Sequence, residues 1–162
     1  MSDNVYLGNP NLKKANTPIE WTEEMMVEFL KCKEDPVYFA NNHVKIVSLD
    51  EGLTQFHPYH FQEKLINNFH ENRFNICKMP RQTGKSTTVV SYLLHYAVFN
   101  DSVNIGILAN KAATARELLG RLQTAYENLP RWMQQGIISW NKGSLELENG
   151  SKILAASTSA SA

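Results

Sequence analysis

The residues best suited to chemistry lie in the stretch KMPRQTGKSTT, residues 78–88. Gly84, Lys85 and Ser86 fit the last three positions of the phosphate-loop pattern G-x-x-x-x-G-K-[ST]. In such a loop, backbone N–H groups and a helix N-terminus converge on a phosphate, a lysine reaches the β- and γ-phosphates, and a hydroxyl binds Mg²⁺. Met79 replaces the first glycine of the pattern but removes none of these groups. The stretch therefore predicts a nucleotide site with Mg²⁺ on Ser86.

Arg81 is the second unusual residue of this loop. An arginine supplied in cis can stabilise the charge that develops on the γ-phosphate during phosphoryl transfer. The alternative for Arg81 is a structural role, bonded to nearby carbonyl groups. The alternative for the whole stretch is a polar helix N-terminus, in which Thr83 caps the helix and Lys85 is solvated.

The elements expected around the loop favour the nucleotide interpretation. Residues 73–79, RFNICKM, read as a buried strand that leads into the loop, and residues 85–99 read as an apolar helix that leads out. A second buried strand is expected over residues 103–109 and an amphipathic helix over residues 111–129. Strands that alternate with helices predict the α/β class: a P-loop NTPase parallel sheet with flanking helices, incomplete at the C-terminus.

Five further expectations concern the rest of the chain. Residues 1–20 have no apolar period, which predicts an irregular arm that wraps a neighbour. A first helix should follow the cap Thr22 and end at Asp35-Pro36, and a second should span residues 58–73. Residues 43–49 alternate as a half-buried strand does. Asn149-Gly150 between two strand-like runs predicts a hairpin.

Composition limits the function classes. The chain has 162 residues with 43% apolar residues, which suits one globular domain. Sixteen Lys and Arg balance sixteen Asp and Glu, so no bulk positive field would hold DNA. Lys111, Arg116 and Arg121 could contact DNA from one helix, but a solvated helix face explains them as well. No apolar run approaches the roughly 20 residues that a membrane span needs.

Cysteine and histidine spacing gives no metal signal in the sequence. Cys32 and Cys77 are far apart, with neither a CxxC spacing nor a companion histidine cluster. This argues against a disulfide framework and against a zinc site, and it favours a reducing, intracellular setting. His43, His60, His70 and His95 show no ligand spacing and are expected on the surface or in helix packing.

PRQTGKST, residues 80–87, belongs to a longer series of stretches that match a known pattern. The others are NPNLKKAN (9–16), EWTEEM (20–25), VYFA (37–40), IGILANK (105–111) and GIISWNKGSLELENGS (136–151). In these stretches the chain resembles the terminase large subunits of tailed phages of the T-even type. The resemblance covers nearly the whole chain, so it is far more specific than the loop alone.

The resemblance implies a motor that couples ATP hydrolysis, with Mg²⁺, to the movement of double-stranded DNA into a capsid. It implies a homo-oligomer on the portal ring, paired with a small terminase subunit, in the host cytoplasm and transiently on the prohead. Full-length members are also endonucleases. The implied nucleotide residues are Gln62, Gln82, Thr83, Gly84, Lys85, Ser86 and Thr87. Lys85 and Arg81 would be catalytic, Ser86 would hold Mg²⁺, and the amide of Gln62 would read the adenine edge.

The residues near Gln62 are divided between the base and the core. His57 and Tyr59 would neighbour the base, whereas Phe61 is expected in the core because it shares a helix face with Leu65 and Phe69.

The resemblance also divides the chain and marks where it departs from the family. Residues 1–56 would form an N-terminal arm and helical lobe, and residues 57–162 a P-loop ATPase core. The family continues into an acidic pair that holds Mg²⁺ and orients the attacking water, then into a nuclease domain; neither is present. We therefore expect a fragment that hydrolyses ATP very slowly by itself and is marginally stable, because unpaired sheet edges remain.

Two rival functions stay open. The chain could be a superfamily 2 helicase-like DNA-dependent ATPase, although such enzymes usually keep a Gly-x-Gly-Lys-Thr spacing. It could also be a non-catalytic nucleotide-binding or portal-docking module, because the catalytic carboxylate is missing.

Overall fold

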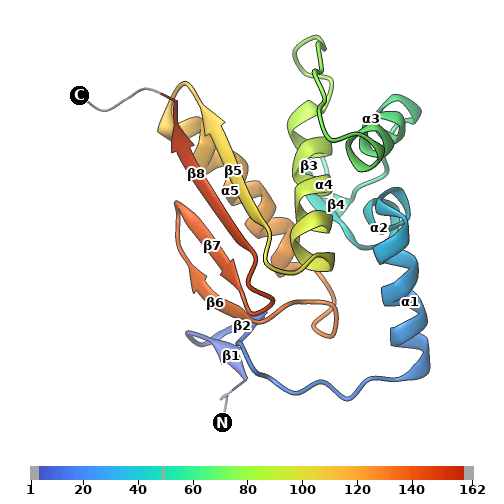
Figure 1. The fold of residues 1–162 in the computed structure, drawn as a ribbon, viewed down its shortest axis with the longest axis vertical. Coiled ribbons are helices and arrows are strands. Elements are labelled where there is room, and N and C mark those ends of the chain that lie inside the picture. Colours follow the sequence, from blue (N-terminus) through green and yellow to red (C-terminus); the bar gives the residue numbers. More distant parts are fainter. Residues whose placement is uncertain (1–3, 49, 159–162) are drawn as a thin grey trace.

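A computed structural model describes residues 4–48 and 50–158 of the chain (Figure 1). In chain order its elements are β1 (Val5–Tyr6), β2 (Asn9–Lys13), α1 (Glu23–Glu34), α2 (Pro36–His43), β3 (Lys45–Ser48), β4 (Gly52–Gln55), α3 (His60–Glu71), α4 (Lys85–Phe99), β5 (Asn104–Ala109), α5 (Ala112–Glu127), β6 (Ile137–Trp140), β7 (Ser144–Leu147) and β8 (Lys152–Ser157). None of the described helices is long and apolar enough to cross a membrane.

A four-stranded sheet with the order β5-β8-β7-β6 forms one side of the molecule (Figure 1). β5 pairs with β8 in parallel, with Ile105 opposite Ile153, whereas β8–β7 and β7–β6 are antiparallel. Alternate residues of the sheet are buried under α5, which contacts both β5 and β8. The expected hairpin at Asn149-Gly150 is confirmed by the β7–β8 pairing, and Gly150 supplies the positive φ of +82° at the turn.

The fold class is mixed α/β, and the expected parallel P-loop sheet is not present in the described residues. Among the strands that the structure describes, only β5 and β8 pair in parallel. The predicted buried strand over residues 73–79 is wrong: this segment belongs to no strand, and residues 73–78 are exposed. In Figure 1 it loops out beyond the start of α4, away from the sheet. An apolar run becomes a strand only where a neighbouring strand pairs with its backbone, and no described strand does so here.

Helix α4 is the central element, as its apolar sequence predicts. It contacts α5 on one side and α2 and α3 on the other. Its buried residues include Val90, Leu94 and Val98, which belong to one hydrophobic cluster extending from Leu12 to Ile153. His95 is also buried in this helix, and its Nε2 lies 2.8 Å from the carbonyl oxygen of Cys32 on α1. The expectation that His95 packs between helices is met by this contact.

The first helix forms where the sequence predicted it, and a second, unpredicted helix follows directly. Thr22 caps α1 as expected, since its hydroxyl accepts a hydrogen bond from the N–H of Met25. Asp35 then ends α1 and caps α2, accepting from the N–H groups of Val37 and Tyr38. Pro36 therefore starts a helix rather than only ending one. The expected strand at 43–49 appears as β3, and it pairs with the unpredicted β4.

The N-terminal arm is more ordered than the sequence predicts. β1 and β2 form a small hairpin, and the arm packs against its own chain beside β6. Leu12 is buried, and the backbone N–H of Lys13 donates a hydrogen bond to the side-chain oxygen of Gln134 at 3.0 Å. The ammonium of Lys13 pairs with Glu148 at 3.3 Å. The arm is thus attached to the β6–β7 end of the sheet.

Candidate nucleotide-binding site

The loop before α4 ends in a backbone geometry that only glycine adopts at low cost. Gly84 is the N-cap of α4 with φ +72° and ψ +18°, in the left-handed region. Glycine has no side chain that could cap the helix. The first hydrogen bond of the helix runs from the N–H of Thr88 to the carbonyl oxygen of Gly84, at 3.0 Å. The N–H groups of the first turn therefore face outward with the positive end of the helix dipole, which is the geometry that attracts an anion.

Lys85 lies across this loop. Its Nζ donates hydrogen bonds to the carbonyl oxygens of Met79, at 2.9 Å, and Pro80, at 2.7 Å. The hydroxyl of Thr83 also donates to Pro80, at 3.0 Å, so Thr83 does not cap the helix. Both observations contradict the alternative of a capped helix with a solvated lysine. The ammonium of Lys85 is instead held by the carbonyl groups of its own loop.

Gln62 on α3 connects that helix to the loop. Its side chain is buried, its Oε1 accepts a hydrogen bond from the N–H of Tyr59 at 2.9 Å, and its Nε2 donates to the oxygen of Thr83 at 3.4 Å. A Cβ on Gly84 would stand 2.4 Å from this Nε2. Gln62 therefore packs directly against the loop, and glycine at position 84 is what allows the approach.

A cavity of about 510 Å³ adjoins the loop. It brings together five of the predicted nucleotide residues: Gln62, Gln82, Thr83, Gly84 and Thr87. Its other walls come from β3, β4 and the start of α3, including the residues expected near the base, His57 and Tyr59. The remaining predicted residues, Arg81, Lys85 and Ser86, do not line it. Arg81 is exposed on the loop, and Ser86 is half-buried in the first turn of α4.

Phe61 corrects an expectation. It is 45% exposed and lines the cavity, whereas the sequence placed it in the core. Its ring stacks on Tyr59, with centroids 5.9 Å apart and planes 10° apart. Leu65 is buried as expected, but its buried neighbours on α3 are Gln62 and Ile66, so the buried face lies closer to Gln62 than the apolar period suggested.

A known family covers the loop before α4 and the part of the chain that follows it. The family described as "Terminase large subunit, T4likevirus-type, N-terminal" matches residues 76–162, which is more than half of the sequence. The chain belongs to this family. The match includes the loop, α4, α5 and the whole four-stranded sheet of the terminase chain. It associates the terminase chain with phage DNA packaging and confirms the resemblance stated above.

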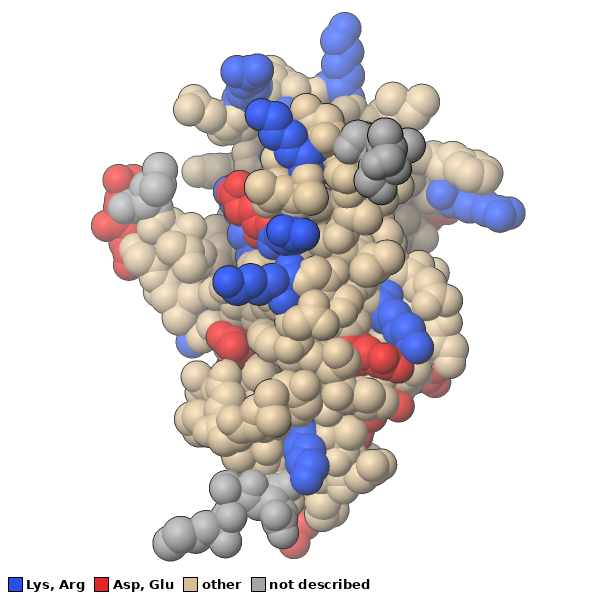
Figure 2. Space-filling model, turned by 90° about the vertical axis from the view of Figure 1, so that its left-hand side faces the viewer, with Lys and Arg blue, Asp and Glu red and all other residues tan. Residues whose placement is uncertain are grey.

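Charges of both signs lie together on one face of this terminase chain. On the face drawn in Figure 2, Lys and Arg are interspersed with Asp, Glu and uncharged residues. On α5, Arg121 pairs with Glu117 at 2.7 Å on an exposed surface, which fits a solvated helix face.

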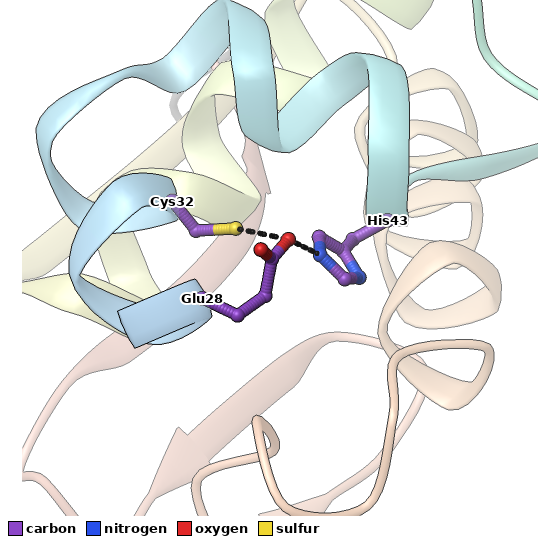
Figure 3. Close-up of side chains that lie close together, drawn as sticks. All are labelled: Glu28, Cys32 and His43. Atoms are coloured by element: carbon purple, nitrogen blue, oxygen red, sulfur yellow. Dashed lines mark hydrogen bonds and ion pairs between the residues drawn. The ribbon is translucent and has the colours of Figure 1, made fainter. Parts of the chain in front are cut away.

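A second group of side chains in the terminase chain, which the sequence did not predict, is formed by Glu28, Cys32 and His43 (Figure 3). His43 Nε2 lies 2.7 Å from Glu28 Oε1, and Cys32 Sγ lies 3.8 Å from the same oxygen. The hydrogen bond from His43 lowers the pKa of Glu28, while burial, with Glu28 nearby, raises the pKa of Cys32 to about 12. The i, i+4 spacing of Glu28 and Cys32 was readable, but the position of His43 depends on the unpredicted helix α2.

Proposed function

We propose that the chain is the ATP-binding part of a phage terminase large subunit that couples ATP hydrolysis to translocation of double-stranded DNA into a capsid. The observation that carries this proposal is the uncapped, left-handed start of α4 at Gly84, with the ammonium of Lys85 held over the same loop. The family match supports the terminase over the helicase-like alternative.

The residues present fit a triphosphate with Mg²⁺. The N–H groups at the start of α4 would bind the β-phosphate, and Lys85 would exchange its bonds to the carbonyls of Met79 and Pro80 for phosphate oxygens. The hydroxyl of Ser86 would hold Mg²⁺, which when bound neutralises charge on the β- and γ-phosphates. Thr87, in the same turn and on the cavity wall, would support the phosphates.

Arg81 and Gln62 would act at opposite ends of the nucleotide. Arg81 is exposed on the loop, so its guanidinium is free to turn toward a γ-phosphate. Gln62 would meet the adenine edge in the cavity beside the loop, where Gln82 and Thr83 are its neighbours. Its amide already bonds to Tyr59 and Thr83, so base recognition would use the second hydrogen of Nε2 and the remaining lone pair of Oε1.

The proposed partners follow from the same function: double-stranded DNA, the portal ring, the small terminase subunit and further copies of the chain. A non-catalytic nucleotide-binding or portal-docking module would share the phosphate grip, and a measurement of hydrolysis by the assembled motor separates the two.

The first test is equilibrium binding of a fluorescent ATP analogue with Mg²⁺ to the chain. Lys85→Ala should reduce affinity at least about tenfold, since a charged hydrogen bond to phosphate is worth roughly 1.5–3 kcal/mol. Lys142→Ala, at an exposed lysine between β6 and β7, is the matched control and should bind as the wild type does. Arg81→Ala should weaken ATP binding more than ADP binding.

Circular dichroism establishes that each protein is folded. A folded wild-type chain without saturable binding, or a Lys85→Ala variant that binds as tightly as the Lys142→Ala control, contradicts the proposal.

A further inference from the structure

Glu28, Cys32 and His43 bring three different metal-binding atoms together away from the loop (Figure 3). A thiol sulfur, an imidazole nitrogen and a carboxylate oxygen all lie within 4.8 Å of one another. Within residues 4–48 and 50–158 this is the one such group of three. Glu28 and Cys32 come from one face of α1, and His43 is the last residue of α2.

The separations are close to those of a tetrahedral zinc site. Zinc bonds of about 2.0 Å to nitrogen or oxygen and about 2.3 Å to sulfur place neighbouring ligand atoms roughly 3.3–3.6 Å apart. The Sγ–Oε1 distance of 3.8 Å is already near this range. The Nε2–Oε1 distance of 2.7 Å must open by roughly half an ångström, which small side-chain rotations achieve.

The surroundings hold the carboxylate in the orientation that a ligand needs. The hydroxyl of Tyr38 donates a hydrogen bond to Glu28 Oε2 at 3.0 Å, which leaves Oε1 turned toward Cys32 and His43. Ligating carboxylates are commonly oriented by a second hydrogen bond of this kind. Cys32 is fully buried, whereas the side chains of Glu28 and His43 are partly exposed, so the group is open to solvent on the side of these two residues.

We propose that Glu28, Cys32 and His43 form a Zn²⁺ site, with water in the fourth position, that fastens α1 to the C-terminal end of α2. Thiolate, imidazole and carboxylate together select zinc over Mg²⁺ or Ca²⁺, which prefer oxygen ligands alone. Binding breaks the Cys32 S–H bond and forms a Zn–S bond, so one proton is released to solvent. The proton on His43 Nε2 moves to Nδ1 through solvent, so that the neutral imidazole binds the ion through Nε2, and the hydrogen bonds from Cys32 and His43 to Glu28 are replaced by bonds to the ion.

The competing explanation is that these side chains form a hydrogen-bonded ion pair that needs no ion. It accounts for the contact between Glu28 and His43, and it predicts that substitution of Cys32 leaves metal affinity unchanged. The two explanations therefore differ in whether substitution of Cys32 lowers the affinity for the metal.

The test is calorimetric titration of the chelator-treated chain with Zn²⁺, repeated in buffers of different ionisation enthalpy to count protons. We expect one ion and about one released proton per chain. Tyr38→Phe should weaken binding by about 10- to 100-fold, and Cys32→Ser and His43→Gln should weaken it more than Tyr38→Phe does. Cys77→Ser, at the exposed cysteine, is the matched control and should leave affinity unchanged.

Co²⁺ gives an independent readout of the sulfur ligand. The wild type and Cys77→Ser should show a thiolate-to-cobalt charge-transfer band that Cys32→Ser lacks. Circular dichroism checks the fold of each variant, and if Cys32→Ser unfolds, His43→Gln and the cobalt spectrum of the wild type decide. A folded wild type without saturable Zn²⁺ binding, or binding that survives both ligand substitutions, overturns the proposal.

Discussion

The side-chain amide of Gln62 donates a hydrogen bond to the carbonyl oxygen of Thr83, 21 residues further along the chain and directly before Gly84. The same side chain accepts from the N–H of Tyr59, so one buried amide connects the start of α3 to the loop before α4. The loop is therefore held from outside its own sequence, and its stability depends on a residue that the phosphate-loop pattern does not contain.

Gln62→Ala should lower the free energy of unfolding by roughly 1–3 kcal/mol, because it leaves the Tyr59 N–H and the Thr83 carbonyl without their partner. Chemical denaturation measures this loss. Gln123→Ala removes a glutamine whose hydrogen bond to Asn141 is exposed, and it should cost less than about 0.5 kcal/mol. Equal losses in the two variants would mean that Gln62 does not brace the loop.

Gly84→Ala should destabilise the chain by roughly 1–3 kcal/mol, since alanine is strained at φ +72° and its Cβ would stand 2.4 Å from Gln62 Nε2. Gly120→Ala on α5 should instead stabilise the chain by up to about 1 kcal/mol, because nothing lies within 4 Å of its added Cβ. Thermal unfolding compares the two. The double variant of Gly84→Ala and Gln62→Ala should lose less stability than the sum of the two single losses, because the added Cβ no longer meets the glutamine side chain. Strictly additive losses would argue against the close approach of Gln62 to Gly84.

Glu148 should make the attachment of the N-terminal arm sensitive to acid. Burial by itself raises the pKa of Glu148, but hydrogen bonds from the N–H groups of Asn16 and Gly136 and the ion pair with Lys13 outweigh it, so the pKa lies below its ordinary 4.5. The carboxylate thus contributes stability that is complete above pH 4.5 and is lost as the pH falls through the folded-state pKa.

Urea denaturation at about pH 6 and about pH 3 measures this dependence. Between these conditions the wild type should lose more stability than Glu148→Gln, which carries no charge to titrate. Glu71→Gln, at an exposed position on α3, is the control and should keep the wild-type slope. A Glu148→Gln variant with an unchanged slope would show that the arm does not depend on this carboxylate.

Ile76→Thr should reduce aggregation without lowering stability. Ile76 is fully exposed in the extended segment before the loop, so its side chain contributes surface for association but no packing. Light scattering on incubation should fall while the free energy of unfolding stays within about 0.5 kcal/mol of the wild-type value. Ile66→Thr, at a fully buried site on α3, should cost at least about 2 kcal/mol, and a similar cost at Ile76 would contradict the exposed placement.

The elements that the sequence predicted well are those whose signals are local. The bounds of α4 agree with its apolar run, α5 and β5 begin within a residue of their expected starts, and the β7–β8 turn follows from Asn149-Gly150. The segment 73–79 was also predicted as a buried strand but forms none, because a strand needs a pairing partner that a local pattern does not reveal. β4 and β6 were not predicted for the same reason, since each forms by pairing with a neighbour, β3 or β7 respectively.

The site was predictable only in part. The Gly84-Lys85-Ser86 sequence located the start of α4, and the structure adds the lysine bonds to Met79 and Pro80 that no spacing rule states. The cluster at Glu28 needed knowledge of a helix boundary at Asp35, which positions His43 eight residues later against α1. Its residues are adjacent in space but have no ligand spacing in sequence.

The turn of the β7–β8 hairpin closes the far end of α4. The side chain of Asn149 donates to the carbonyl oxygens of Ala97, at 2.9 Å, and Asn100, at 3.1 Å, where the helix ends. Helix α4 has 15 residues and is about 22 Å long. Its N-terminus lies uncapped beside the loop, and its C-terminus is hydrogen-bonded to the hairpin turn of the sheet. One continuous helix therefore joins the hairpin turn at one end to Gly84 and Lys85 at the other, so the position of these two residues depends on the sheet as well as on α3.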